Sequence, residues 1–382
     1  MKFAFIAAVL ASSRSLVDVS GLEEQIVIPQ SELQAMLPQT PSFNYTLSDA
    51  FTVGSDDEFI TTAEASNFTD TATYEEVTDF FTRLSAQSEF VQVESLVELE
   101  TGEDVWMVTV SGEQQFSADT MTRPVFFVTA GIHAGESLGV NAGMMFARNL
   151  VMDPEYADLL NSVNFLIIPV LNIQGYVRQS ENGRINQFGP NTSGRRINGN
   201  WLNLNRDFGK IDTPEIRAVV SVMSRYDVSF YADLHSTDGM NSQEDVTWCD
   251  NGFAGVANEI DDWLSNEMKP DLEEFLVGYG FQPGPCYLAN APSDPTAGYY
   301  PYLSDGPTYS ASYANIRQIP AYLLESHSLK PFKQRVLGGY GFLYGVMTVL
   351  SQKTDSLRAV IVADRAARVG TLLKEPVELL VH

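Results

Sequence analysis

Short, mostly apolar runs alternate with stretches of helical spacing over the middle of the chain. The runs are typical of strands buried on both faces, and they occupy residues 125–129, 165–170, 228–234 and 321–324. Helical stretches follow them at 137–151, from 213 onward, at 253–278 and at 333–351. This alternation predicts an α/β fold with a mostly parallel, mixed central sheet that helices cover on both faces.

The region before this block has a pattern of its own. Apolar residues at helical spacing predict a helix over 74–86, and two alternating segments, 90–99 and 105–111, predict a β-hairpin. Residues 14–73 are rich in Ser, Thr, Asp and Glu. We expect them to form an N-terminal extension that packs on the main domain or is partly disordered.

The two ends of the chain differ from the middle. Residues 1–13 combine a lysine, an apolar run and small residues, which resembles a short secretory signal peptide; a buried N-terminal segment is the alternative. We therefore expect a periplasmic or secreted protein, and a cytoplasmic one if the segment is not a signal. The main domain is expected at 74–351, followed at 352–382 by a charged helical tail that looks truncated.

Two regions follow neither pattern. Residues 178–202 form a long polar stretch full of Gly, Asn and Arg, and a loop of this length is usually functional or disordered. Residues 282–315 are rich in Pro, Gly and Tyr, and we expect loops there.

Composition narrows the choice of partners. The chain has 382 residues, of which 44% are hydrophobic, a formal charge of −26 and a pI of about 4.3. Binding to nucleic acid or to an anionic membrane needs clustered cations, so we expect neither partner. No stretch reaches the roughly 20 apolar residues that span a bilayer, so no membrane span is expected.

The cations of this acidic chain are concentrated in one part. Seven of them lie within 40 residues: Arg178, Arg184, Arg195, Arg196, Arg206, Lys210 and Arg217. The cluster suggests a site for an anion such as a carboxylate, whereas a balanced surface loop is the plainer interpretation for most of its members.

Side chains that can bind a metal stand at the ends of three predicted strands. His133 and Glu136 follow the first strand, His235 follows the third, and Glu325 follows the last. Sites in open α/β sheets collect outside the carboxyl ends of strands. Two histidines and a carboxylate are the ligands of a catalytic zinc with one position left for water. Taken alone, each residue has a plainer interpretation: His235 as an ordinary core or surface histidine, and Glu325 as the partner of Lys330 in an ion pair.

The cysteines and the remaining histidines add little. Cys249 and Cys286 do not make a cysteine-based zinc framework, and they either form one disulfide or stay free. His327 is expected to support Glu325 structurally or to face solvent.

Six motifs follow one another along the chain: HAGE at 133–136, PVLNIQGY at 169–176, RIN at 196–198, LNRDF at 204–208, DLH at 233–235 and LESH at 324–327. In this set and order they resemble the M14 family of zinc metallocarboxypeptidases. The resemblance extends from about residue 74 to residue 351, and it implies the carboxypeptidase-like variant of the predicted fold.

For metal binding and catalysis, the resemblance implies one zinc per chain held by His133, Glu136 and His235. Glu325 would be the general base toward a zinc-activated water and then the acid toward the leaving amine. Arg196 would polarise the scissile carbonyl and hold the oxyanion, although its neighbour Arg195 would exchange roles with it if the alignment slipped by one residue.

For substrate binding, the resemblance implies that Asn205 and Arg206 hold the terminal carboxylate of a peptide. Tyr302 and Tyr309 are the candidates for the family's mobile site tyrosine. The residue that selects the released side chain is expected within 304–312, where Asp305 is the charged candidate.

One position departs from the family pattern. Asn203 stands where the family often has an aspartate that orients a zinc histidine. An asparagine carbonyl accepts the same imidazole N–H, but it is neutral, so the histidine would be a less basic ligand.

The resulting hypothesis is a zinc-dependent metallocarboxypeptidase that releases C-terminal residues from peptides with a free C-terminal carboxylate. A zinc amidohydrolase acting on acylated amino acids or cell-wall peptides is the first alternative, and a non-catalytic binding module is the second. Residues 14–73 are also considered as a prosegment.

Overall fold

The computed structural model describes residues 31, 32, 35, 51–250, 258–289, 298–301 and 306–372. The predicted signal segment, most of residues 14–50, Tyr302, Asp305 and the chain end after residue 372 lie outside the described residues.

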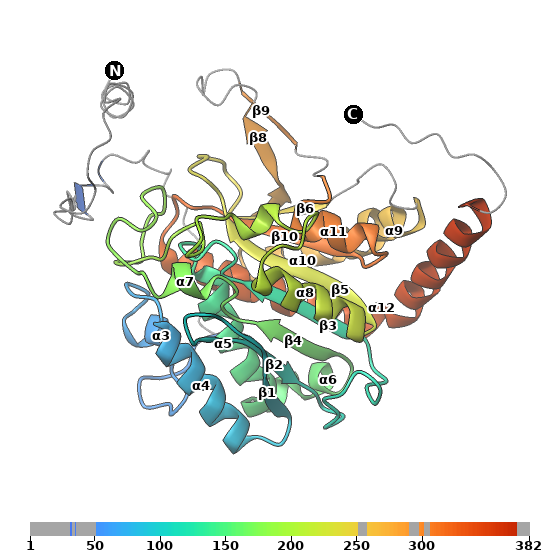
Figure 1. Ribbon diagram of the computed structural model, residues 1–382, viewed down its shortest axis with the longest axis horizontal. Coiled ribbons are helices and arrows are strands. Elements are labelled where there is room, and N and C mark those ends of the chain that lie inside the picture. The colour runs from blue at the N-terminus through green and yellow to red at the C-terminus, as the bar shows by residue number, and fades with distance from the viewer. Residues whose placement is uncertain are drawn as a thin grey trace.

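An eight-stranded mixed sheet runs through the molecule in the order β1-β2-β4-β3-β5-β10-β6-β7 (Figure 1). Its strands are β1 (Val91–Glu98), β2 (Asp104–Val110), β3 (Val125–Ala130), β4 (Asn164–Ile168), β5 (Val228–Ser236), β6 (Val246–Asp250), β7 (Pro283–Pro285) and β10 (Ala321–Ser326). The four central strands, β4, β3, β5 and β10, are parallel neighbours. The β1–β2, β2–β4 and β10–β6 pairs are antiparallel, so the predicted fold class is confirmed.

Helices cover both faces of this sheet, α5 and α12 on one side and α8 and α11 on the other (Figure 1). The longer helices are α4 (Tyr74–Gln87), α5 (Leu138–Met152), α8 (Pro214–Arg225), α10 (Lys269–Gly278) and α12 (Phe332–Leu372). The shorter ones are α3 (Thr62–Ala65), α6 (Ala157–Leu160), α7 (Ile173–Tyr176), α9 (Asn258–Trp263) and α11 (Ser310–Ile316).

Local capping explains why two helices begin where the sequence predicts. Thr73 accepts the backbone N–H of Glu76, and the Glu76 carboxylate accepts the N–H of Thr73, which is a capping box at the start of α4. Thr213 caps α8, and Pro214 occupies its first position, where no N–H is needed.

Residues 282–315 are more ordered than predicted. They contain β7, the hairpin of β8 (Tyr287–Ala289) and β9 (Tyr299–Pro301), and helix α11, so the expectation of loops alone is wrong. α11 depends on distant partners, because its first residue donates its backbone N–H to Asn205 and its hydroxyl to Asp233. The sequence pattern within residues 282–315 gives no information on these contacts with distant segments.

The C-terminal helix agrees with the predicted helix and helical tail. α12 spans Phe332–Leu372 and joins two helical segments across a kink at Lys353, close to the predicted boundary between them. Leu357 and Ile361 beyond this point are buried, so the second half keeps an apolar side against the domain.

Residues 51–73 pack into the main core. Phe51 and Phe59 are 1% and 2% exposed, and Arg148 of α5 forms a buried ion pair with Glu64. This part of the predicted extension therefore shares the hydrophobic core of the domain.

The sheet brings the ends of three strands together. β3 and β10 flank β5, with Thr129 opposite Asp233 and Glu325 opposite His235. Residues paired across neighbouring strands point to the same face. The sheet thereby places Glu325, His235 and Asp233 on one face beside the turn that follows β3.

Candidate metal centre

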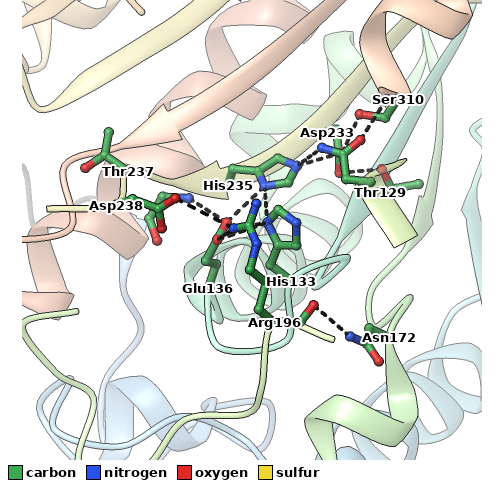
Figure 2. A network of polar contacts seen from close by, with 12 residues as sticks. Thr129, His133, Glu136, Asn172, Arg196, Asp233, His235, Thr237, Asp238 and Ser310 are labelled. Carbon is green, nitrogen blue, oxygen red and sulfur yellow. Dashed lines mark hydrogen bonds and ion pairs between the residues drawn. The ribbon is translucent and has the colours of Figure 1, made fainter. Parts of the chain in front are cut away.

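Three side chains form a compact group of donor atoms at this edge of the sheet. The Nδ1 atoms of His133 and His235 are 3.1 Å apart, and they lie 3.0 and 2.9 Å from Glu136 Oε1 and Oε2. All three residues are at most 4% exposed. Figure 2 shows the three side chains converging, so the residues that the sequence predicts as metal ligands do lie together.

A tight turn after β3 delivers two of the donors. Gly131 has φ +65°, a conformation that glycine adopts without strain. The Glu136 N–H then donates to the His133 carbonyl at 2.9 Å, which closes the HAGE segment into a turn before α5 begins. The turn directs the His133 and Glu136 side chains toward the end of β5.

Each imidazole is oriented by its second nitrogen. His133 Nε2 lies 3.0 Å from Asn203 Oδ1, and His235 Nε2 lies 2.8 Å from Asp233 Oδ2. Because these oxygens accept N–H groups from the Nε2 atoms, the Nδ1 atom of each imidazole, once deprotonated, would present its lone pair to the centre. The predicted role of Asn203 matches this geometry. Asp233 belongs to the DLH motif, but sequence reasoning assigned it no role.

Asp233 is itself held in place on the far side of His235. Its carboxylate accepts the hydroxyl groups of Thr129 at 2.7 Å and Ser310 at 2.5 Å. Burial raises the pKa of Asp233, but His235 and these hydroxyls outweigh it and leave the pKa below its ordinary value. The carboxylate is therefore charged where it supports His235 (Figure 2).

The donor set fits a zinc ion. Two imidazole lone pairs and a carboxylate facing one another repel unless a cation lies between them. Tetrahedral zinc with bonds of about 2.05 Å has donor separations of roughly 3.3 Å, close to those observed. Burial opposes the charge on Glu136, but His133 and Arg184 hold its pKa well below the usual range, so it is an anionic donor.

Arg184 is a component that sequence reasoning did not single out. Its guanidinium lies 2.7 Å from Glu136 Oε1 and also bonds to Asp238, and its side chain is 8% exposed. For this member of the arginine cluster, a balanced surface loop was the wrong interpretation. Nothing in the local pattern distinguishes Arg184 from its exposed neighbour Arg178.

Glu325 lies beside the donors without binding to them. One of its carboxylate oxygens, Oε2, is shielded from solvent and has no hydrogen-bond partner in the part of the chain that the structure describes. Burial raises the pKa of Glu325 to about 8, aided by the charge of Glu136 and opposed by that of His235. The ammonium of Lys330 donates to the Gln243 carbonyl, and no ion pair joins it to Glu325 among the described residues.

Arg196 is the one of the two neighbouring arginines whose guanidinium reaches the donors. Its Nη1 lies 3.3 Å from His133 Nδ1 and 3.6 Å from Glu136 Oε1. The side chain is 32% exposed, so it lies between the buried donors and solvent. Asn172 supports its backbone from the start of α7, as Figure 2 shows.

The predicted carboxylate-binding residues lie on the other side of His235. Asn205 is buried, accepts the Ser310 N–H at 2.8 Å, and has its amide nitrogen 3.3 Å from His235 Nε2. Arg206 is exposed and stacks on the ring of Tyr309 at 3.8 Å. Asn205 is thus engaged within the protein, whereas Arg206 and Tyr309 form a pair at the surface.

Three further expectations concern neighbouring residues. His327 is 2% exposed, so it does not face solvent, and its Nε2 lies 3.0 Å from the Ser242 carbonyl. Cys249 and Cys286 form a disulfide, which decides the alternative that the sequence left open. Among the described residues, the helices are too short or too polar to cross a membrane.

Comparisons with known proteins match this architecture. The model of the zinc carboxypeptidase family, Peptidase_M14, matches residues 77–247, which include all three donors. Human carboxypeptidase D is 29% identical over 123 residues, which are 29% of this chain and 8% of that protein. The chain thus matches only a small part of that relative's length.

Two solved structures show the same fold. A metallo-carboxypeptidase from Burkholderia cenocepacia has a TM-score of 0.56 at 17% identity, over 74% of this chain and 70% of that one. Carboxypeptidase A from Helicoverpa armigera has a TM-score of 0.53 at 16% identity, over 83% and 78%. Residues 77–247 therefore match the model of the zinc carboxypeptidase family, and the chain has the carboxypeptidase fold.

Proposed function

We propose that the protein is a zinc-dependent metallocarboxypeptidase that hydrolyses the C-terminal bond of peptides. The observation that carries the proposal is the carboxylate of Glu325. It lies opposite His235 in the adjacent strand, it is not a member of the donor group, and it has an oxygen without a partner in the described part of the chain. Burying a carboxylate oxygen without a hydrogen bond costs free energy, and such groups are often found where they take part in catalysis.

His133, Glu136 and His235 would hold the zinc, which when bound supplies a Lewis acid that polarises the scissile carbonyl and acidifies water. The remaining steps belong to the protein's own groups. Glu325 would take a proton from the attacking water and return it to the leaving amine. In the metal-free protein its pKa is raised to about 8, which suits the acid step toward the leaving amine. The charge of a bound zinc would lower this pKa toward the range that the base step needs.

Arg196 would support the same reaction. Its guanidinium lies beside the donors and is 32% exposed, and its fixed positive charge would stabilise the developing oxyanion of a carbonyl that entered there. Arg206, stacked on Tyr309, is the cation we assign to the terminal carboxylate of the substrate. Asn205 would assist with its amide Nδ2–H, because the bond from Ser310 occupies only its side-chain oxygen.

A mixture of peptides incubated with the zinc-loaded protein tests this function. We expect mass spectrometry to show stepwise loss of C-terminal residues that a chelator stops and that Glu325→Gln abolishes. C-terminally amidated copies of the same peptides should stay intact. If peptides with free C-termini remain intact in protein shown to hold one zinc per chain, the proposal is wrong, and acylated amino acids and D-amino-acid peptides become the substrates to test.

We also propose that the protein is exported. The disulfide between Cys249 and Cys286 supports this, because disulfides persist mainly in oxidising compartments. Mass spectrometry of protein recovered from its native cells should find the disulfide intact and the first residues removed. Recovery of the full N-terminus with both thiols reduced would contradict export.

A further inference from the structure

Each donor of the metal centre is bonded to a second residue that orients it toward the centre. Asn203 holds His133 and Asp233 holds His235, as described above. The partner of the third donor, Glu136, comes from a different part of the chain. It is Arg184, in the long polar loop at 178–202.

Both oxygens of Glu136 are fixed by protein donors. Arg184 Nη2 lies 2.7 Å from Oε1, and the backbone N–H of Ser236 donates to Oε2 at 3.0 Å. A glutamate has three rotatable side-chain torsions, and the Ser236 N–H alone leaves the carboxylate free to turn about its hydrogen bond. The arginine is the second anchor that sets the plane of the carboxylate.

Arg184 is itself held firmly. Its Nε donates to Asn186 Oδ1 at 3.0 Å, its Nη2 also bonds to Asp238, and Asn186 Nδ2 donates to the same Asp238 oxygen at 3.0 Å. Its Nη1 is buried and has no hydrogen-bond partner among the described residues. The guanidinium is therefore fixed in the position in which it binds both Glu136 and Asp238, although this position leaves its Nη1 without a hydrogen bond among the described residues.

Two glycines permit this close approach. A Cβ on Gly135, between the two donors of the HAGE segment, would lie 2.6 Å from Arg184 Cβ and 2.7 Å from the Gly194 carbonyl oxygen. A Cβ on Gly183 would lie 1.8 Å from the Ser193 carbonyl oxygen. A larger residue at Gly135 would push the loop away from the HAGE turn, and one at Gly183 would push two parts of the loop apart, so Arg184 is packed against the metal centre and does not merely extend over it.

We propose that Arg184 is a positioning residue that sets the orientation of Glu136 and thereby the zinc affinity of the centre. Its positive charge by itself would repel a zinc ion. However, Asp238 is bonded to the same nitrogen and offsets part of this charge, so we expect the orienting effect to be the larger one. The inference rests on the proposed metal site, but it does not require that the protein cleave peptides.

Zinc affinity, measured by competition with a chromophoric chelator, tests this role in the full chain. We expect Arg184→Met to bind zinc about 10- to 100-fold more weakly, the range found for partners of metal ligands. Arg184→Lys keeps a cation of similar length without the planar fork, and it should restore part of the loss. Arg178→Met is the matched control, because Arg178 is exposed in the same loop, and its affinity should equal the wild type's.

The absorption spectrum of the cobalt-substituted protein provides a readout that a merely structural role would not change. Altered band positions are expected for Arg184→Met and not for Arg178→Met, because only the former lets the Glu136 carboxylate turn. Unchanged zinc affinity and an unchanged cobalt spectrum in folded Arg184→Met would refute the proposal. If that variant does not fold, wild-type affinity and spectrum in Arg184→Lys would refute it equally. Wild-type protein that binds zinc but cleaves no peptide would overturn the proposed function and leave this inference in place.

Discussion

Replacement of Arg148 by methionine tests whether residues 51–65 are an integral part of the domain. Arg148 reaches from α5 to this segment and holds both oxygens of Glu64, at 2.7 and 3.0 Å. It also donates to the carbonyls of Phe59 and Phe51, at 3.1 and 3.4 Å. Methionine preserves most of the apolar stem and removes every one of these bonds.

The expected loss of stability follows from the charge that remains. The side chains of Arg148 and Glu64 are 1% and 2% exposed, and breaking a buried ion pair costs about 3–5 kcal/mol because an uncompensated charge is left behind. Glu64 keeps three neutral donors, from the Val53 N–H, the Thr61 N–H and the Thr61 hydroxyl. These bonds place the expected value at the lower end, about 3 kcal/mol.

Urea denaturation, followed by circular dichroism, measures this change. Arg365→Met is the matched control, because Arg365 pairs with Asp227 at the surface, where the side chains are 45% and 86% exposed. Such a pair contributes at most about 1 kcal/mol. The double variant Arg148→Met with Glu64→Gln should regain stability relative to Arg148→Met alone, since it leaves no buried charge. A loss below about 1 kcal/mol for Arg148→Met would refute the reasoning.

Three further predictions concern the site and its surroundings. Glu325→Gln should lower kcat by about 10²–10⁴-fold while zinc content stays the same, and retained turnover would exclude Glu325 as the base. Asn203→Asp should bind zinc more tightly in chelator competition, because an anionic partner makes His133 a more basic ligand; equal or weaker binding would contradict this. Burial lowers the pKa of His327 from 6.5 to about 4, so the folded state disfavours its protonation, and the free energy of unfolding should fall by at most about 3 kcal/mol as pH drops through this window. His327→Gln should remove this part of the pH dependence, and an unchanged acid profile would show that His327 is not its source.

The three metal donors were predictable because their geometry is set by local features. An apolar run that ends in a glycine turn identifies the end of β3, and His133 and Glu136 follow it directly. His235 lies at the end of another buried run. Since parallel strands end at the same edge of a sheet, side chains far apart in sequence are brought together without knowledge of any specific contact.

The partners of these donors were less predictable. Asp233 is two residues from His235 and on the same face of β5, so alternation along the strand was a signal that could have identified it. No such signal exists for Arg184, which lies 48 positions from Glu136 in an irregular loop. Arginines in that loop share the same local composition, and only their burial separates them.

The alternation of buried strands and helices, the capped helix starts and the choice of the three candidate metal donors were therefore determined by the sequence itself, because periodicity, capping and strand ends are local properties. The tertiary structure alone decided the disulfide between Cys249 and Cys286, the short helix α11 and the place of Arg184. Each of these depends on a contact between distant segments, whose free energy exists only after the sheet has brought them together.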